Sequence, residues 1–257
     1  MANDAFFYIF LGIFSGVASG LFGIGGGIII MPSMFILGVN PHDAVVLSVI
    51  QMVFSSSFGT FIHYKNKKID LKDGVFIGLG GFLGAGFSAI ILNYISDLEL
   101  ICIFLCVSII FFTQYAFNIR PKILVAKKIL FAKNIILLFV GIFVGIFAIS
   151  LGIGGGFLIG PILAYFLGYD SKKIASSSLL FVLFASLSGT ISFFYFDILN
   201  FEILKKGILI GISSMIGVLM GIQFLNKINI KSHLKFLLSI YALSILTTSF
   251  SLLKKIL

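Results

Sequence analysis

Two short glycine-rich stretches decide how this chain of 257 residues folds. The first reads LFGIGGGIIIMP at residues 21–32, and the second reads SLGIGGGFLIGP at residues 150–161. Both stretches lie inside long apolar runs, where glycine costs a helix about 1 kcal/mol per residue and proline about 3 kcal/mol. The sequence therefore predicts that a helix breaks at each stretch.

The composition places the chain in a lipid bilayer. Hydrophobic residues make up 60% of the sequence and charged residues only 11%, whereas an average soluble domain is about 25% charged. The apolar runs, such as 101–112 and 135–146, do not alternate with polar residues as the strands of a membrane barrel do. We therefore predict an all-α integral membrane protein, and we exclude soluble enzymes and nucleic-acid-binding proteins.

Segments free of Asp, Glu, Lys and Arg mark the expected membrane spans. They are 5–42, 44–64, 74–96, 100–119, 134–169, 174–196, 207–226 and 236–253. Six of them have the length of roughly 20 residues that crosses a bilayer once, and the first and fifth are too long for a single straight helix. The sequence predicts a bundle of about eight spans, with a Gly-broken helix at the start of each half.

The two breaks correspond because the sequence repeats itself. The residues Gly12, Gly16, Gly23, Gly25, Gly26, Gly27 and Pro32 recur as identical residues 129 positions later. Ser48 and Thr60 meet Ser178 and Thr190 at an offset of 130. We predict two homologous transmembrane repeats, residues 1–119 and 134–257, joined by a basic cytoplasmic linker at 120–133.

The net charge of +9 comes from 18 basic and 9 acidic residues. The basic residues lie in short loops, which is typical of the positive-inside rule. With eight crossings, 13 basic residues share the cytoplasmic side with both termini, against 5 outside. If each glycine-interrupted run instead folds back, there are ten crossings, both termini lie outside, and the count is 14 to 4. Both arrangements stay open, and both place loops 64–73 and 117–133 in the cytoplasm.

Matched glycine-interrupted segments in two halves indicate the binding site of a transporter. The free N–H groups at the start of each second half-helix attract anions, together with the helix dipole. Repeat-equivalent hydroxyls add hydrogen-bond donors, and a glutamine between them could orient a ligand. The expected substrate-binding residues are Gly23, Gly25, Gly26, Gly27, Pro32, Ser48, Gln51, Thr60, Gly152, Gly154, Gly155, Gly156, Pro161, Ser178 and Thr190.

The same two stretches carry a family resemblance. Residues 12–32, with their spaced glycines and final proline, resemble the first signature of the sulfite exporter TauE/SafE family, and 150–161 resemble its second signature. The resemblance implies a permease of the cytoplasmic membrane with seven or eight spans. It also implies a small sulfur-containing or carboxylate anion as substrate. One departure is that Ser176-Ser177-Ser178 resembles the family's polar segment, while the first half retains only Ser48.

We therefore predict a secondary transporter for a small anion, such as sulfite or a sulfonate, with alternating access at the repeat interface. The alternatives are a non-transporting membrane scaffold or an intramembrane enzyme, although the sequence has no nucleophile elbow, zinc-protease motif or Walker loop. No cofactor or metal is expected, because Cys102 and Cys106 have no Cys/His cluster around them. The expected partners are the anion and the bilayer, and homo-oligomerisation stays open. His63 is expected at the membrane interface.

Overall fold

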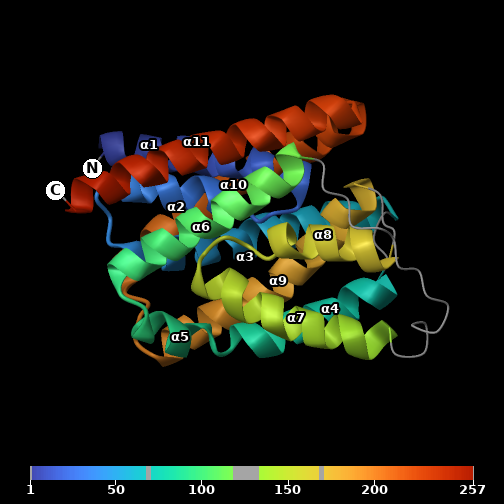
Figure 1. Ribbon diagram of the computed structural model, residues 1–257, viewed down its shortest axis with the longest axis horizontal. Coiled ribbons are helices and arrows are strands. Elements are labelled where there is room, and N and C mark those ends of the chain that lie inside the picture. Colours follow the sequence, from blue (N-terminus) through green and yellow to red (C-terminus); the bar gives the residue numbers. More distant parts are fainter. Residues whose placement is uncertain (1, 68–70, 118–132, 168–170, 257) are drawn as a thin grey trace.

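The computed structural model describes residues 2–67, 71–117, 133–167 and 171–256. All regular elements of these residues are helices (Figure 1). They are α1 (Ala2–Phe22), α2 (Gly27–Ile36), α3 (Pro41–Lys65), α4 (Leu71–Ala85), α5 (Ser88–Tyr94), α6 (Asp97–Ala116), α7 (Lys133–Ser150), α8 (Gly156–Leu167), α9 (Ser171–Tyr195), α10 (Phe201–Lys227) and α11 (Ile230–Ile256). The prediction of an all-α membrane protein is confirmed.

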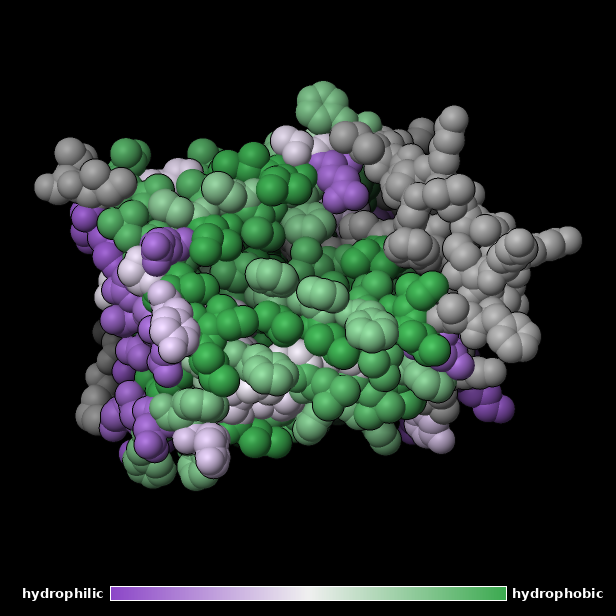
Figure 2. All heavy atoms as spheres, turned by 60° about the horizontal axis from the view of Figure 1, so that its bottom comes forward, coloured by the Kyte–Doolittle hydropathy of each residue, from purple (hydrophilic) through white to green (hydrophobic). Residues whose placement is uncertain are grey.

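Seven of these helices are long and apolar enough to cross a bilayer. The count is eight if α4 and α5, which meet at a bend of 42°, form one broken span. The predicted number of about eight spans is therefore confirmed. A broad apolar surface covers the middle of the molecule, with hydrophilic residues gathered at its ends (Figure 2). Large exposed side chains of this surface include Phe139, Phe143 and Phe147, one turn apart on α7, and we assign them to the lipid-facing side.

Contacts with α11 show how the first glycine-interrupted run is arranged. The Nε2 atom of His233, near the start of α11, lies 3.0 Å from the carbonyl oxygen of Leu21 at the end of α1. Ser251, near the end of α11, donates a hydrogen bond of 3.2 Å to the carbonyl oxygen of Phe35 at the end of α2. The ends of α1 and α2 thus lie at opposite ends of α11, so α2 folds back along α1.

The second run folds back as well, toward the opposite end of the bundle. The α7 helix starts at Lys133, which pairs with Asp73 at the start of α4, and ends at Ser150, whose hydroxyl lies 3.4 Å from the carbonyl oxygen of Ser88. Gly160 of α8 then lies near the Tyr115 hydroxyl, in the last turn of α6. The last turn of α6 lies toward the end of the bundle where α7 starts (Figure 1). Helix α8 therefore returns toward the end where α7 began.

We call the end of the bundle that holds Lys65 and Lys133 the inner end, and the end that holds Asp97 and Lys255 the outer end. The Lys255 ammonium lies 2.9 Å from the Asp97 carboxylate at the start of α6, and both chain termini are at this outer end (Figure 1). This is the arrangement in which each glycine-interrupted run folds back. The structure differs from the eight-crossing arrangement, which places the C-terminus on the side of loop 64–73.

Close helix contacts join the first part of the chain to the second. Helix α1 packs along α10, where Gly16 lies against the backbone of Ser214, and α4 packs along α7, where Gly84 lies against the backbone of Ile142. Any side chain at these glycines would overlap the facing backbone, which is how small residues let membrane helices approach closely. The division into two homologous repeats and a linker at 120–133 stays a prediction, and residues 120–132 lie outside the described residues.

Labelling from one side of the membrane tests the arrangement of the ends. In a chain with Cys102→Ala and Cys106→Ala, we expect Lys254→Cys to react with a membrane-impermeant maleimide added outside intact cells. Asn66→Cys should react only after permeabilisation, because the two exposed positions lie at opposite ends of the bundle. Equal labelling of both variants from one side would contradict the folded-back arrangement.

Candidate functional site

The two GIGGG segments cross each other directly. A methyl group added to Gly27 would overlap the carbonyl oxygen of Gly152, and one added to Gly154 would overlap that of Ile24. One added to Gly156 would likewise overlap the carbonyl oxygen of Gly23. We call this contact of residues 23–27 with 152–156 the glycine crossing. Side chains cannot fit there, so both stretches need glycine for backbone-to-backbone approach.

The backbone of the crossing also needs glycine for its conformation. The φ angles of Gly25 and Gly26 are 82° and 90°, and those of Gly152 and Gly154 are 61° and 85°, a region that costs other residues free energy. Gly26 is the N-cap of α2 and makes no side-chain cap hydrogen bond. Since the first N–H groups of a helix have no partner within it, this N-terminus has donors available at the crossing.

Helix α3 presents a polar strip to the crossing. It begins firmly, with Asn40 accepting a hydrogen bond from the N–H of His42 and with Pro41 at its first position. Two turns further, the Ser48 hydroxyl donates a hydrogen bond of 2.7 Å to the carbonyl oxygen of Gly152, and the Ser55 hydroxyl lies 3.4 Å from that of Gly25. Ser48 and Ser55 are seven residues apart, or about two helical turns, so their side chains lie on one face of the helix.

Gln51 lies on this polar strip, between Ser48 and Ser55. Its Nε2 and Oε1 atoms would both be 3.1 Å from a methyl group added to Gly26. The side chain is 0% exposed, and neither polar atom has a hydrogen-bond partner in the described part of the chain. A buried polar group without a partner costs about 1–3 kcal/mol. The Gln51 amide is therefore an unsatisfied donor and acceptor at the crossing.

The second half supplies a different surface. Ser178, which the predicted repeat matches with Ser48, is fully buried, and its hydroxyl has no partner among the described residues. Phe181, which the predicted repeat matches with Gln51, packs its ring against Gly155 and Gly81. The crossing is thus polar on the side of Gln51 and aromatic on the side of Phe181.

Several predicted site residues lie away from this centre. Thr60 is nine residues beyond Gln51, or about 13 Å along α3, and Thr190 bonds the carbonyl oxygen of Ser186 on its own helix. Pro32 is buried inside α2, beyond the first turn. Pro161 lies within α8, and its side chain is outside the described residues. The structure brings together the glycines, Ser48 and Gln51, but not the two threonines.

The sequence analysis missed part of the site. Met52 packs against Gly25 and Gly27, and the carbonyl oxygen of Ser15 lies close to Gly26. Ser55 is absent from the predicted site, although its spacing from Ser48 and Gln51 could have assigned it to the same helix face. His63 is 1% exposed in the last turn of α3, two residues before Lys65 at the inner end, and its position at the membrane interface stays a prediction. The described residues contain no group of three His, Cys, Asp or Glu placed to hold a metal.

Comparison with known proteins identifies similar chains. The family model described as "Sulfite exporter TauE/SafE" matches residues 8–248. A probable membrane transporter protein of Bacillus subtilis, YunE, is 26% identical over 72% of this chain and 76% of its own length. YdhB of the same organism is 25% identical over 84% and 90%. Protein MJ0441 of Methanocaldococcus jannaschii, also named a probable membrane transporter protein, is 27% identical over 90% of both. No solved structure matches significantly.

The hydrogen bond from Ser48 to Gly152 gives a stability test of the crossing. Ser48→Ala leaves the Gly152 carbonyl oxygen without this donor, so we expect the free energy of unfolding to fall by about 1–3 kcal/mol. Ser57→Ala is the matched control, because that exposed serine on α3 bonds only the carbonyl oxygen of Val53 on its own helix. Thermal unfolding in detergent measures both, and equal midpoints for the two variants would contradict the role given to Ser48.

Proposed function

Since the chain belongs to the sulfite exporter TauE/SafE family and is therefore a membrane transporter rather than an enzyme, we propose that its solute is a small anion. Sulfite, a sulfonate or a related small organic anion fits the proposal. The anion binds at the glycine crossing and passes by alternating access. The protein works in the cytoplasmic membrane, with the inner end of the bundle facing the cytoplasm.

The observation that carries this proposal is the buried Gln51 amide. A polar side chain at membrane depth is costly unless something pairs with it. Gln51 lies against the N-cap of α2 without a hydrogen-bond partner among the described residues. A solute that accepts hydrogen bonds from its Nε2 would remove this cost. The free amide therefore supports binding of a polar solute at this place.

The start of α2 supports the negative charge of that solute. The N–H groups of Gly27 and Ile28 belong to the first turn of the helix, where the dipole places partial positive charge. Gly26 provides no side-chain oxygen to compete for these donors. An oxyanion could then accept hydrogen bonds from the backbone and from Gln51 at once, as anions do at other helix N-termini.

The opposite directions of α2 and α8 support alternating access. From the crossing, α2 leads to the outer end and α8 to the inner end, as their contacts with Ser251 and Tyr115 indicate. Movement of one against the other would open the crossing to one side at a time. Broken helices of this kind meet at the fixed binding site of many secondary transporters.

Flux measurements in proteoliposomes test the proposal. We expect saturable uptake of at least one radiolabelled anion among sulfite, sulfate, methanesulfonate and acetate, competed by an excess of the same unlabelled anion. Comparison with and without a proton gradient separates coupled from passive flux. Empty liposomes are the control, and no flux of any anion would favour a scaffold or a different class of solute.

Substitution of Gln51 tests its assigned role. Gln51→Leu keeps the approximate size of the side chain but replaces the polar amide with apolar methyl groups. A hydrogen bond to a charged group contributes about 1.5–3 kcal/mol, so we expect the apparent affinity for the transported anion to fall about tenfold to a hundredfold. Gln223→Leu is the matched control, because Gln223 is exposed on α10. If both variants transport with unchanged affinity, the solute binds elsewhere.

A further inference from the structure

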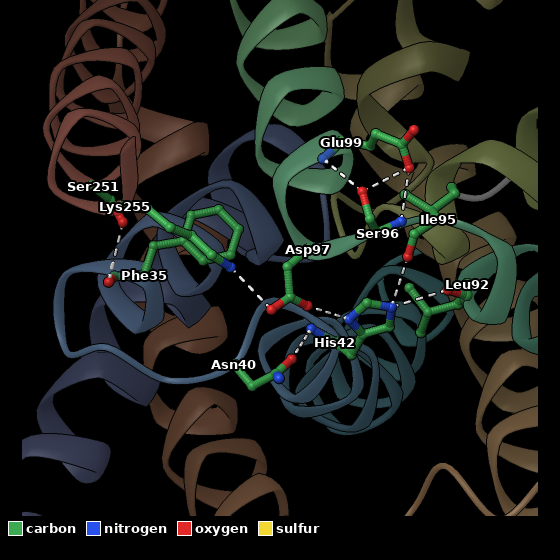
Figure 3. Close-up of polar contacts among 10 residues, drawn as sticks. All are labelled: Phe35, Asn40, His42, Leu92, Ile95, Ser96, Asp97, Glu99, Ser251 and Lys255. Carbon is green, nitrogen blue, oxygen red and sulfur yellow. Dashed lines mark hydrogen bonds and ion pairs between the residues drawn. The ribbon is translucent and has the colours of Figure 1, made fainter. Parts of the chain in front are cut away.

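A histidine-centred cluster holds three helix ends together at the outer end of the bundle (Figure 3). His42 lies in the first turn of α3, Asp97 is the first residue of α6, and Lys255 is in the last turn of α11. The His42 Nδ1 atom is 2.7 Å from one Asp97 oxygen, and the Lys255 ammonium is 2.9 Å from the other. We call these three residues the outer clamp.

Both ring nitrogens of His42 face hydrogen-bond acceptors. While Nδ1 faces the Asp97 carboxylate, Nε2 lies 3.0 Å from each of the carbonyl oxygens of Leu92 and Ile95 (Figure 3). All three partners are acceptors. An imidazolium donates from both nitrogens, whereas a neutral imidazole has one N–H and would turn a lone pair toward an acceptor. The observed contacts therefore fit protonated His42.

The surroundings of the clamp are fixed by local structure. Asn40 caps α3 beside His42, and Ser96 and Glu99 form a capping box at the start of α6. These caps hold the two helix starts in place, so the His42–Asp97 contact joins elements that are already well formed. Opening the clamp then separates helix ends rather than unfolding them.

Other charged groups at this end bear on the clamp. Asp43 follows His42 on α3 and is close enough to feel the charges of His42, Asp97 and Lys206 of α10. Helix α5 contributes only backbone carbonyl oxygens to the contacts of His42. The His42 side chain is 24% exposed, so protons from the outer solution reach it.

We propose that the outer clamp is a proton-operated gate, closed while His42 is protonated and released when His42 loses its proton. Deprotonation removes the positive charge and one of the two N–H donors of the ring. His42 then no longer attracts the Asp97 carboxylate as a cation, and it turns a lone pair toward Asp97 or toward the carbonyl oxygens of Leu92 and Ile95. The start of α6 can then move away from α3 and α11. The gate controls access from the outer solution, and in this respect it rests on the proposed transport function.

The gate predicts that the outer end becomes more accessible as pH rises. Leu100, one turn below Asp97 on α6, is fully buried. In a chain with Cys102→Ala and Cys106→Ala, Leu100→Cys reports opening by its reaction with an impermeant maleimide. Release of one proton shifts the ratio of open to closed states by up to about tenfold per pH unit. Glu202→Cys, exposed at the same end, corrects for the greater reactivity of thiolate at high pH.

We expect the corrected labelling rate to rise with pH as the imidazolium of His42 loses its proton. With His42→Gln the rate should be high and independent of pH. Asp97→Asn should behave in the same way, and it serves if His42→Gln does not fold. With His233→Gln the rise should persist. Among the described residues, the His233 ring has one hydrogen-bond partner, the carbonyl oxygen of Leu21, and it takes no part in the outer clamp.

The labelling experiment is independent of any solute. A flat rate in the parent chain, a rise that survives both His42→Gln and Asp97→Asn, or a rise that His233→Gln abolishes would overturn the gate. Absence of anion flux in proteoliposomes, with the pH-dependent labelling intact, would instead count against the proposed function alone. The two proposals therefore fail separately.

Discussion

In the hydrocarbon core of a membrane, every backbone N–H and C=O group needs a partner within the protein. The glycine crossing breaks two helices at this depth, and the rest of the fold compensates for the break. Ser48 of α3 satisfies the carbonyl oxygen of Gly152, the Gly26 carbonyl oxygen accepts from Ile30, and all residues from Leu21 to Pro32 are buried. Irregular backbone is tolerated here because protein, not lipid, surrounds it.

The helices around the crossing are held by contacts that a side chain would abolish. Gly16 and Gly20 of α1 lie against the backbone of α10, and Gly80 and Gly84 of α4 lie against α7. These interfaces tie each glycine-interrupted run to a helix from the other part of the chain. The outer ends of α3, α6 and α11 are joined by charged side chains instead. The packing of small residues does not depend on pH, whereas the contact between a histidine and a carboxylate depends on whether the imidazole is protonated.

The sequence predicts the spans and the helix breaks because hydropathy and glycine content are local properties. It does not predict the fold-back, since the basic residues divide almost equally well in either arrangement. Gln51 could be assigned to the site because an unpaired amide in lipid is costly wherever it lies. Thr60 and Thr190 could not be placed, because a matching position in a sequence repeat does not determine which neighbouring helix a side chain faces. Asp97 and Lys255 are 158 residues apart, and no local pattern connects them with His42.

A transporter must give its inward-open and outward-open states different contacts, because a solute or a proton shifts an equilibrium only by interacting differently with the two states. The predicted repeats alone would make those states equivalent. This chain removes the equivalence twice. Gln51 lies against Gly26 and the Phe181 ring against Gly155, so the two sides of the crossing differ in polarity. In the proposed gate His42 closes the outer end through Asp97, while Lys133 pairs with Asp73 at the inner end. The proposed solute site at Gln51 and the proposed gate at His42 both lie on α3, so this shared helix is the physical connection by which one would influence the other.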